Sequence, residues 1–344
     1  MQFTPAQDGS TAEKSRVRHL ADHAATEHPL PVVHDLPASE HLQTTLAAPI
    51  HCRGIALHSG LDVNLVLSPA AADTGIRFER SDRPGSSSFP ALYDRIVDTR
   101  LSTVVACPED PSLRVATIEH LMAALHALEI DNVLVSVSGP ELPVLDGSSD
   151  AFAFLIKCAG RRILETPRRT IEILRTVRVE GKNGSFAELR PAPRGLSLAI
   201  SLSFEASAIG NQRYAMQLEE RRFLEEVAFC RTFVNRQDIE HLQSIGLARG
   251  GSLDNAVVVD GANILNPGGL KIEREFARHK LLDAIGDIYC CGHRMKAGFI
   301  GHKSGHALNN SLLRAVFADQ KNWRFLPVAQ NSVDHLRRRP RVAA

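Results

Sequence analysis

Residues 278–287, RHKLLDAIGD, place a histidine and two aspartates four positions apart, at His279, Asp283 and Asp287. In a helix, residues four apart lie about 40° from one another, so these three side chains form one polar stripe. Two ligands one helical turn apart can reach a single metal ion, and His279 and Asp283 are therefore compatible with half of a metal site. The alternative is a solvent-exposed helix face, which is the more frequent situation because charged side chains seldom lie inside a protein.

Partners for such a half-site occur in TIEHL (117–121), where Glu119 and His120 stand near the start of an expected helix. His120, His279 and Asp283 together would supply three ligands and leave a position open, which is typical of a catalytic zinc site. Glu119 could take the proton of the attacking water, as the glutamate of HExxH does. The alternative is a Glu119 that only favours the helix macrodipole. Two histidines and a carboxylate also describe non-haem iron(II) oxygenases, although these need no such base.

His306 is a further candidate, because HKSGHALNN (302–310) places it at a glycine turn before a helix. A contact with Asp287 would fix the imidazole tautomer and raise the pKa of His306. The resulting imidazolium could stabilise an oxyanion or protonate a leaving amine. The alternative is a histidine that only caps the helix or closes the turn.

The elements that must position these residues follow from periodicity and turn signals. The pattern predicts helices over 115–128, 147–160, 273–290 and after 303–310. It predicts strands over 61–66, 75–79, 131–139, 196–204 and 297–301, and a turn at 182–184. Residues 161–169 are interpreted as a linker, and residues 234–269 as a glycine-rich insertion.

The two halves of the chain resemble each other. Each has a histidine early in a helix, then a strand, then a second helix about 26 residues after the histidine. We therefore predict an α+β fold with two similar domains, residues 41–165 and 170–325, each a β-sheet layered with helices. His120 and His279 would occupy equivalent places and meet at the domain interface, where ligand sites often lie.

Composition excludes several classes of protein. The 344 residues are 44% hydrophobic and carry a formal charge of +1, which supports packed cores and gives no general attraction to nucleic acid. We expect no transmembrane segment, because no apolar run approaches ~20 residues. We expect no signal peptide, because the N-terminal residues 1–36 lack a charged start followed by an apolar core. Six scattered cysteines suit the reducing cytoplasm. Residues 1–40 are predicted to form a flexible N-terminal arm and residues 326–344 a basic tail. We expect the protein to be a monomer.

Several segments in this order resemble the zinc-dependent UDP-3-O-acyl-N-acetylglucosamine deacetylase family, over about residues 41–325. They are GIALHSG (54–60), TIEHLMAAL (117–125), IDN (130–132), DGSS (146–149), NQRYA (211–215), RTF (231–233), GGS (250–252), VVVD (257–260), FARHKLLDAIGD (276–287) and HKSGHALNN (302–310). The resemblance implies hydrolysis of the 2-N-acetyl group of UDP-3-O-acyl-N-acetylglucosamine, the committed step of lipid A biosynthesis. It also implies an active site between two α+β domains.

Residue by residue, the resemblance implies zinc ligands at His120, His279 and Asp283. It implies a general base at Glu119 and an electrostatic stabiliser and general acid at His306, supported by Asp287. Lys280 and Thr232 match positions that hold the substrate and the developing oxyanion. The insertion after Phe233 resembles an apolar passage for the fatty acyl chain, to which we assign Phe233, Ile239, Gly251 and Ser252.

The chain departs from the family pattern at Ala56 and Val234, which each replace a glycine, and at Asn255, a polar residue in the expected apolar wall. These departures affect the acyl-length preference rather than the chemistry. The implied partner is a UDP-sugar with a fatty acyl chain, and this chain suggests transient contact with a membrane surface. Besides the iron(II) oxygenase, a second alternative to the deacetylase is a non-enzymatic, degenerate relative that binds partners through its N-terminal arm. The complete set of acid, base and ligands argues against that alternative.

Overall fold

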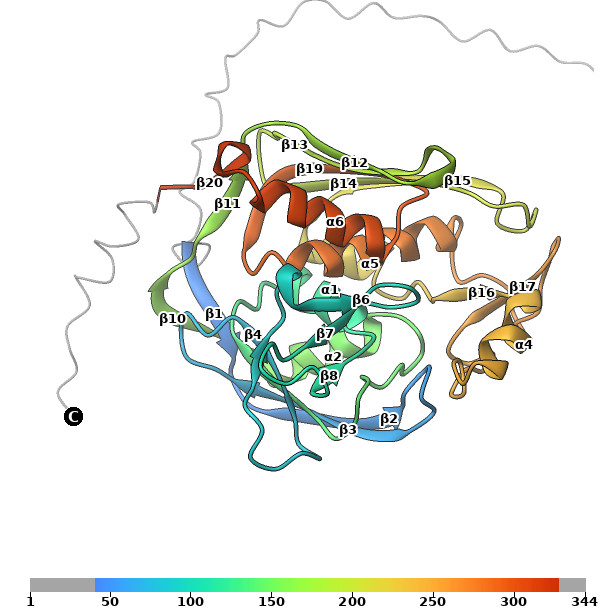
Figure 1. The fold of residues 1–344 in the computed structure, drawn as a ribbon, viewed down its shortest axis with the longest axis horizontal. Helices are drawn as coiled ribbons and strands as arrows, with labels where there is room; N and C mark the ends of the chain where they lie inside the picture. The colour runs from blue at the N-terminus through green and yellow to red at the C-terminus, as the bar shows by residue number, and fades with distance from the viewer. Residues whose placement is uncertain (1–40, 328–344) are drawn as a thin grey trace, which may run out of the picture. The chain divides into compact units, whose positions relative to one another are not determined.

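The computed structural model describes residues 41–327, so the predicted arm and nearly all of the predicted basic tail lie outside the described residues. Two β-sheets enclose two layers of helices (Figure 1). The helices α1 (Glu119–Ala127) and α2 (Asp150–Ala159) lie on one sheet, and α5 (Glu275–Tyr289) and α6 (His306–Phe317) lie on the other. The predicted α+β class is confirmed.

The first sheet has five strands in the order β2-β3-β9-β4-β5. Their bounds are Ile50–Ile55, Asp62–Pro69, Val133–Val137, Ile76–Arg80 and Phe89–Pro90. Strand β9 is central, antiparallel to β3 and parallel to β4. Val133, Val135 and Val137 of β9 are fully buried, because alternate residues of a strand point to one face and this face packs on the helices.

The second sheet repeats this arrangement around β19 (Arg294–His302), which is antiparallel to β13 and parallel to β14. Its other strands are β12 (Val177–Glu180), β13 (Phe186–Arg190), β14 (Leu196–Ser203), β15 (Asn211–Gln217), β11 (Thr170–Ile173) and β20 (Trp323–Phe325). The pairings β12-β13-β19-β14-β15 correspond one for one to β2-β3-β9-β4-β5. This correspondence supports the expected duplication, while the domain limits 41–165 and 170–325 stay a prediction.

Each half carries an insertion before its site-bearing helix. The first comprises β6 (Ile96–Asp98), β7 (Val104–Ala106) and β8 (Arg114–Val115), and precedes α1. The second comprises β16 (Phe233–Asn235), α4 (Arg236–Ser244), β17 (Val257–Asp260) and β18 (Asn263–Ile264), between α3 (Glu220–Glu226) and α5. Short 3₁₀ helices occur at Tyr93–Arg95, Lys182–Gly184 and Gln320–Asn322.

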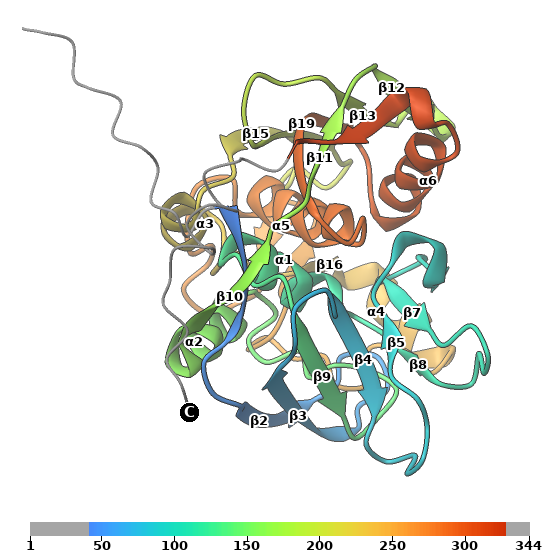
Figure 2. The same ribbon diagram turned by 90° about the vertical axis from the view of Figure 1, so that its left-hand side faces the viewer.

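Two sequence predictions about the elements were wrong. The predicted linker 161–169 contains strand β10 (Arg161–Pro167), which pairs antiparallel with β1 (Leu42–Leu46) beside the helices (Figure 2). Its mostly exposed side chains hide the strand from pattern analysis, because the partner strand is more than 100 residues away. The helix predicted from residue 115 begins only at Glu119, since Val115 belongs to β8 and Thr117 has a positive φ of 59°.

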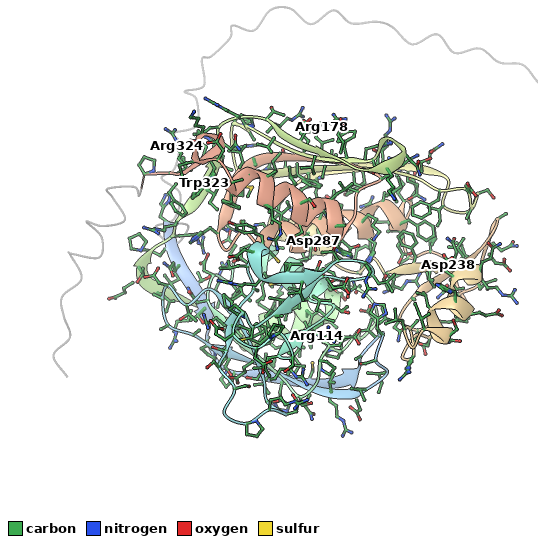
Figure 3. The ribbon with its side chains drawn as sticks, viewed as in Figure 1. Arg114, Arg178, Asp238, Asp287, Trp323 and Arg324 are labelled. Carbon is green, nitrogen blue, oxygen red and sulfur yellow. The ribbon has the colours of Figure 1, made fainter. Side chains whose placement is uncertain are left out.

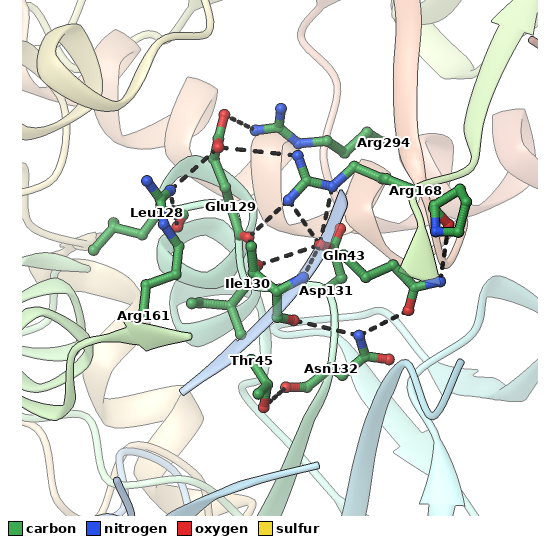
Figure 4. Close-up of polar contacts among 12 residues, drawn as sticks. Gln43, Thr45, Leu128, Glu129, Ile130, Asp131, Asn132, Arg161, Arg168 and Arg294 are labelled. Atoms are coloured by element: carbon green, nitrogen blue, oxygen red, sulfur yellow. Dashed lines mark hydrogen bonds and ion pairs between the residues drawn. The ribbon is translucent and has the colours of Figure 1, made fainter. Parts of the chain in front are cut away.

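An ion-pair network joins the two halves (Figure 4). Arg168, which follows β10, places Nη2 2.7 Å from Asp131 Oδ2 in the loop after α1. Arg294, the first residue of β19, places Nη2 2.7 Å from Glu129 Oε1. Arg168 and Asp131 are mostly buried, and breaking a buried ion pair by removing one partner typically costs about 3–5 kcal/mol.

Helices α1 and α5 pack closely at Gly286. A Cβ atom at this position would lie 2.0 Å from the carbonyl oxygen of Glu119. We therefore expect Gly286→Ala to lower the free energy of unfolding by at least about 1–3 kcal/mol, the usual cost of overpacking. Denaturant unfolding measures this change, with Gly305→Ala as the control because no atom lies within 4 Å of its added Cβ. Equal stability of both variants would contradict this account of the packing.

Candidate metal and acid–base site

His120, His279 and Asp283 form a group that could hold a metal ion. One ligand atom from each residue lies within 4.8 Å of those of the other two. His120 comes from α1 and the others from α5, so the close packing of these helices brings the three together. Asp283 Oδ1 lies 3.5 Å from His120 Nε2 and 3.4 Å from His279 Nε2. The two imidazole rings meet edge to face, with centroids 5.0 Å apart.

The tautomer of His279 suits a metal ligand. Its Nδ1 lies 3.0 Å from the backbone carbonyl oxygen of Cys230, which can only accept a hydrogen bond. Nδ1 therefore carries the proton, and the lone pair of Nε2 points into the group. Burial lowers the pKa of His279 to about 4, which keeps the ring neutral.

Asp283 provides the strongest indication that this group binds a cation. Its Oδ2 accepts a hydrogen bond from Lys280 Nζ at 2.8 Å, whereas its buried Oδ1 has no hydrogen-bond partner among residues 41–327. Burial opposes its ionisation, but electrostatic interactions with its neighbours, among them the Lys280 ammonium, lower the pKa of Asp283 well below its usual value. A buried, ionised oxygen without a donor is costly unless a cation binds it. The donor set of two imidazoles and one carboxylate fits zinc.

Glu119 stands beside this group with one oxygen held and one free for chemistry. Its Oε2 accepts a hydrogen bond from the backbone N–H of Thr103 at 2.9 Å. Its Oε1 lies 3.9 Å from His306 Nε2. Burial raises the pKa of Glu119, against the opposing charges of His306 and His120. A raised pKa makes a carboxylate a more effective general base near neutral pH, because the best base has a pKa close to the working pH.

His306, the first residue of α6, is held by Asp287 of α5. His306 Nδ1 lies 2.9 Å from Asp287 Oδ2, which also accepts a hydrogen bond from Asn309 Nδ2 at 2.8 Å. Burial alone would lower the pKa of His306, but the negative charges of Asp287 and Glu119 raise it to about 9. The imidazolium is therefore the form present near neutral pH, and it faces Glu119. Asp287 lies between the helix layers in Figure 3.

The exposed-face alternative for the stripe on α5 is wrong. His279, Asp283 and Asp287 are at most 4% exposed. Helix α5 is enclosed by α1, α6 and the second sheet, so its polar side chains face other elements rather than water. Glu119 and His306 are likewise buried, which disfavours the capping and macrodipole interpretations as complete accounts of these residues.

The residues assigned to the acyl passage line one cavity of about 410 Å³ between α4 and β17. Phe233, Ile239, Gly251 and Ser252 are all in its wall, and so is Thr232, which was assigned to the substrate and the oxyanion. The Phe233 ring also lies 6.2 Å from that of His279, and Lys280 Nζ lies 5.7 Å from the Phe233 ring centroid. The cavity therefore adjoins the metal-binding group.

The interpretation of Asn255 as a polar residue in this wall was wrong. The Asn255 side chain accepts a hydrogen bond from Ser252 N at 2.9 Å and donates one to Gly250 O at 2.9 Å. It stabilises the loop that carries Gly251 and Ser252, and it is not among the residues that line the cavity.

Sequence reasoning assigned no role to three groups that contact the candidate site: Thr103, Asn309 and the carbonyl of Cys230. Asn309 stands in HALNN, at helical spacing from His306, which is a usable signal. Thr103 and Cys230 contact the site from segments far from it in sequence, and no local pattern marks them.

Comparisons with known proteins identify the family of this chain. The family model described as UDP-3-O-acyl N-acetylglycosamine deacetylase matches residues 43–318. The chain is 42% identical over 286 residues to the UDP-3-O-acyl-N-acetylglucosamine deacetylase of Actinobacillus pleuropneumoniae serotype 3 (strain JL03). It is 43% identical to the protein of that name from Glaesserella parasuis serovar 5 (strain SH0165). Each match covers 83% of this chain and 92% of the relative. Within residues 41–327, no helix is both long and apolar enough to cross a membrane.

Proposed function

The chain belongs to the UDP-3-O-acyl-N-acetylglucosamine deacetylase family of lipid A biosynthesis and is a deacetylase, and from this premise we propose that it uses zinc held by His120, His279 and Asp283. The observation that carries this proposal is the buried Asp283 Oδ1, which faces the Nε2 atoms of both histidines. When bound, zinc polarises the acetyl carbonyl and makes water easier to deprotonate.

Glu119 acts as the general base in this proposal. Its free Oε1 takes a proton from the water that attacks the acetyl carbonyl carbon, while the Thr103 N–H holds Oε2 in place. A new C–O bond forms, and the carbonyl oxygen becomes an oxyanion. Lys280 and Thr232 hold the substrate and this oxyanion from the side of the apolar cavity.

His306 acts as the electrostatic stabiliser and general acid. Its imidazolium offsets the negative charge of the oxyanion, and Nε2–H is the proton that can pass to the sugar nitrogen. The C–N bond then breaks, giving acetate and the free 2-amino group. Asp287 keeps Nδ1 protonated, so that Nε2 is the atom that points toward the reaction.

The substrate we propose is a UDP-linked N-acetylglucosamine with a fatty acyl chain on O3. The cavity lined by Phe233, Ile239, Gly251 and Ser252 takes the acyl chain next to the metal-binding group. We propose that a single chain, acting as a monomer, carries out the reaction. The six cysteines are free, which suits a reducing cytoplasm. We also propose transient contact with a membrane surface through the fatty acyl chain of the substrate.

Acetate release from the purified protein tests this function. We expect acetate and the free amine from UDP-3-O-acyl-N-acetylglucosamine, loss of the reaction after a chelator, and recovery after zinc is added back. An iron(II) oxygenase would instead consume oxygen. Undiminished acetate release from protein shown by elemental analysis to be metal-free would contradict the metal proposal while leaving the deacetylase activity intact.

The pH dependence of the rate tests the role of His306. Its acid form is lost as pH rises through a pKa raised to about 9, so kcat is expected to fall on the alkaline side. The charge of a bound divalent ion opposes the imidazolium, which places this limb at or below pH 9. We expect His306→Gln to reduce kcat by about 10²-fold and to remove this limb. An unchanged alkaline limb in the variant would exclude His306 as the acid.

A further inference from the structure

Thr103 contacts both catalytic carboxylates at once, although it lies in the insertion of the first half, just before β7. Its backbone N–H donates to Glu119 Oε2 at 2.9 Å, and its hydroxyl donates to Asp287 Oδ1 at 2.5 Å. Its carbonyl oxygen accepts a hydrogen bond from the backbone N–H of Ile118, immediately before α1, at 3.3 Å. Thr103 is 3% exposed.

We propose that Thr103 is a positioning residue, which fixes the position of the general base Glu119 relative to the Asp287–His306 pair. This inference rests on the proposed function of those residues. Glu119 belongs to α1 and Asp287 to α5, so a single residue of a third segment fixes the two carboxylates across the interface between the halves.

For Asp287, the Thr103 hydroxyl completes the set of hydrogen bonds. Oδ2 accepts from His306 and Asn309, and Oδ1 accepts from Thr103, so both oxygens of this buried carboxylate have donors. With both oxygens held, the carboxylate cannot rotate without losing a hydrogen bond. The orientation of the His306 ring, and hence the direction of its Nε2, therefore depends in part on Thr103.

For Glu119, the Thr103 N–H decides which oxygen remains free. Because Oε2 is held, Oε1 is the oxygen that lies toward His306 Nε2, at 3.9 Å. The base and the acid therefore face the same space, as consecutive proton transfers to and from one reacting group require. The segment that bears Thr103 also bears Leu101, which lines the acyl cavity. The same segment thus contacts both the apolar cavity and the catalytic carboxylates.

Thr103→Val tests the hydroxyl, because it removes the donor to Asp287 while keeping the size of the side chain and the backbone N–H. We expect kcat to fall about 10–100-fold, as for other partners that orient catalytic groups, with KM within about twofold of wild type. Thr103→Ser keeps the hydroxyl and should retain most of the rate. Zinc content, measured by elemental analysis, should be unchanged in both variants.

Thr45→Val is the matched control. Thr45 is also fully buried, and its hydroxyl donates to Asn132 O at 2.7 Å, in the region of the ion-pair network (Figure 4). This control should lose stability but keep its kcat. If Thr103→Val folds poorly, Thr103→Cys replaces it, because a thiol of similar size is a weaker donor.

A wild-type kcat in Thr103→Val would overturn the inference. So would a Thr103→Ser variant as slow as Thr103→Val, or a rate loss that follows melting temperature equally in the Thr103 and Thr45 variants. Failure of the proposed function is a separate result, because the wild-type protein itself would then release no acetate.

Discussion

Glu119→Gln is expected to reduce kcat by about 10²–10⁴-fold while the protein keeps its zinc, since proton transfer by a positioned base contributes a factor of this size. A glutamine can still accept the hydrogen bond from Thr103 N–H, so the side chain should stay in place. Its amide group cannot take a proton from water. The loss should therefore be in kcat, with little change in melting temperature.

A matched control for this variant is Glu172→Gln in β11. Glu172 forms ion pairs with Lys296 and Arg324 within the second sheet, and none of these residues belongs to the candidate site. We expect this control to keep its rate. A Glu119→Gln variant with nearly wild-type kcat would exclude Glu119 as the base, and a variant without zinc would place Glu119 among the ligands instead.

Asp283→Ala is expected to differ from Glu119→Gln in zinc content, because it should lose both zinc and rate. Only His120 and His279 would remain as ligands, and three protein ligands are typical of catalytic zinc sites. The rate should fall by more than the roughly 10–100-fold that follows loss of a partner outside the ligand set. Elemental analysis after dialysis against a weak chelator measures the zinc, and the acetate assay measures the rate.

The control for this variant must separate loss of a ligand from loss of stability. Asp131→Asn removes a buried ion pair with Arg168 and should destabilise the fold without affecting zinc content. Full zinc occupancy in Asp283→Ala would refute the ligand assignment. Equal zinc loss in both variants would show that unfolding, rather than ligand removal, releases the metal.

The local sequence was sufficient for the residue types and for their spacing along each helix. The four-residue spacing of His279, Asp283 and Asp287 places them on one stripe of α5 whatever surrounds the helix, because helical geometry is local. The low-level repeat likewise predicted equivalent places for His120 and His279, and their rings lie 5.0 Å apart. The first inference depends on helical periodicity and the second on the similarity of the two halves, and both can be read directly from the sequence.

The burial of that stripe could not be read locally, and the more frequent exposed alternative proved wrong. Whether a polar helix face meets water or another element depends on packing between segments that are more than 100 residues apart. The same reason applies to β10, which is a strand because β1 pairs with it. It applies above all to Thr103, whose contacts with Glu119 and Asp287 span 16 and 184 positions. Side-chain hydrogen bonds of such separation leave no periodic trace, so the tertiary structure alone places this residue between the two carboxylates.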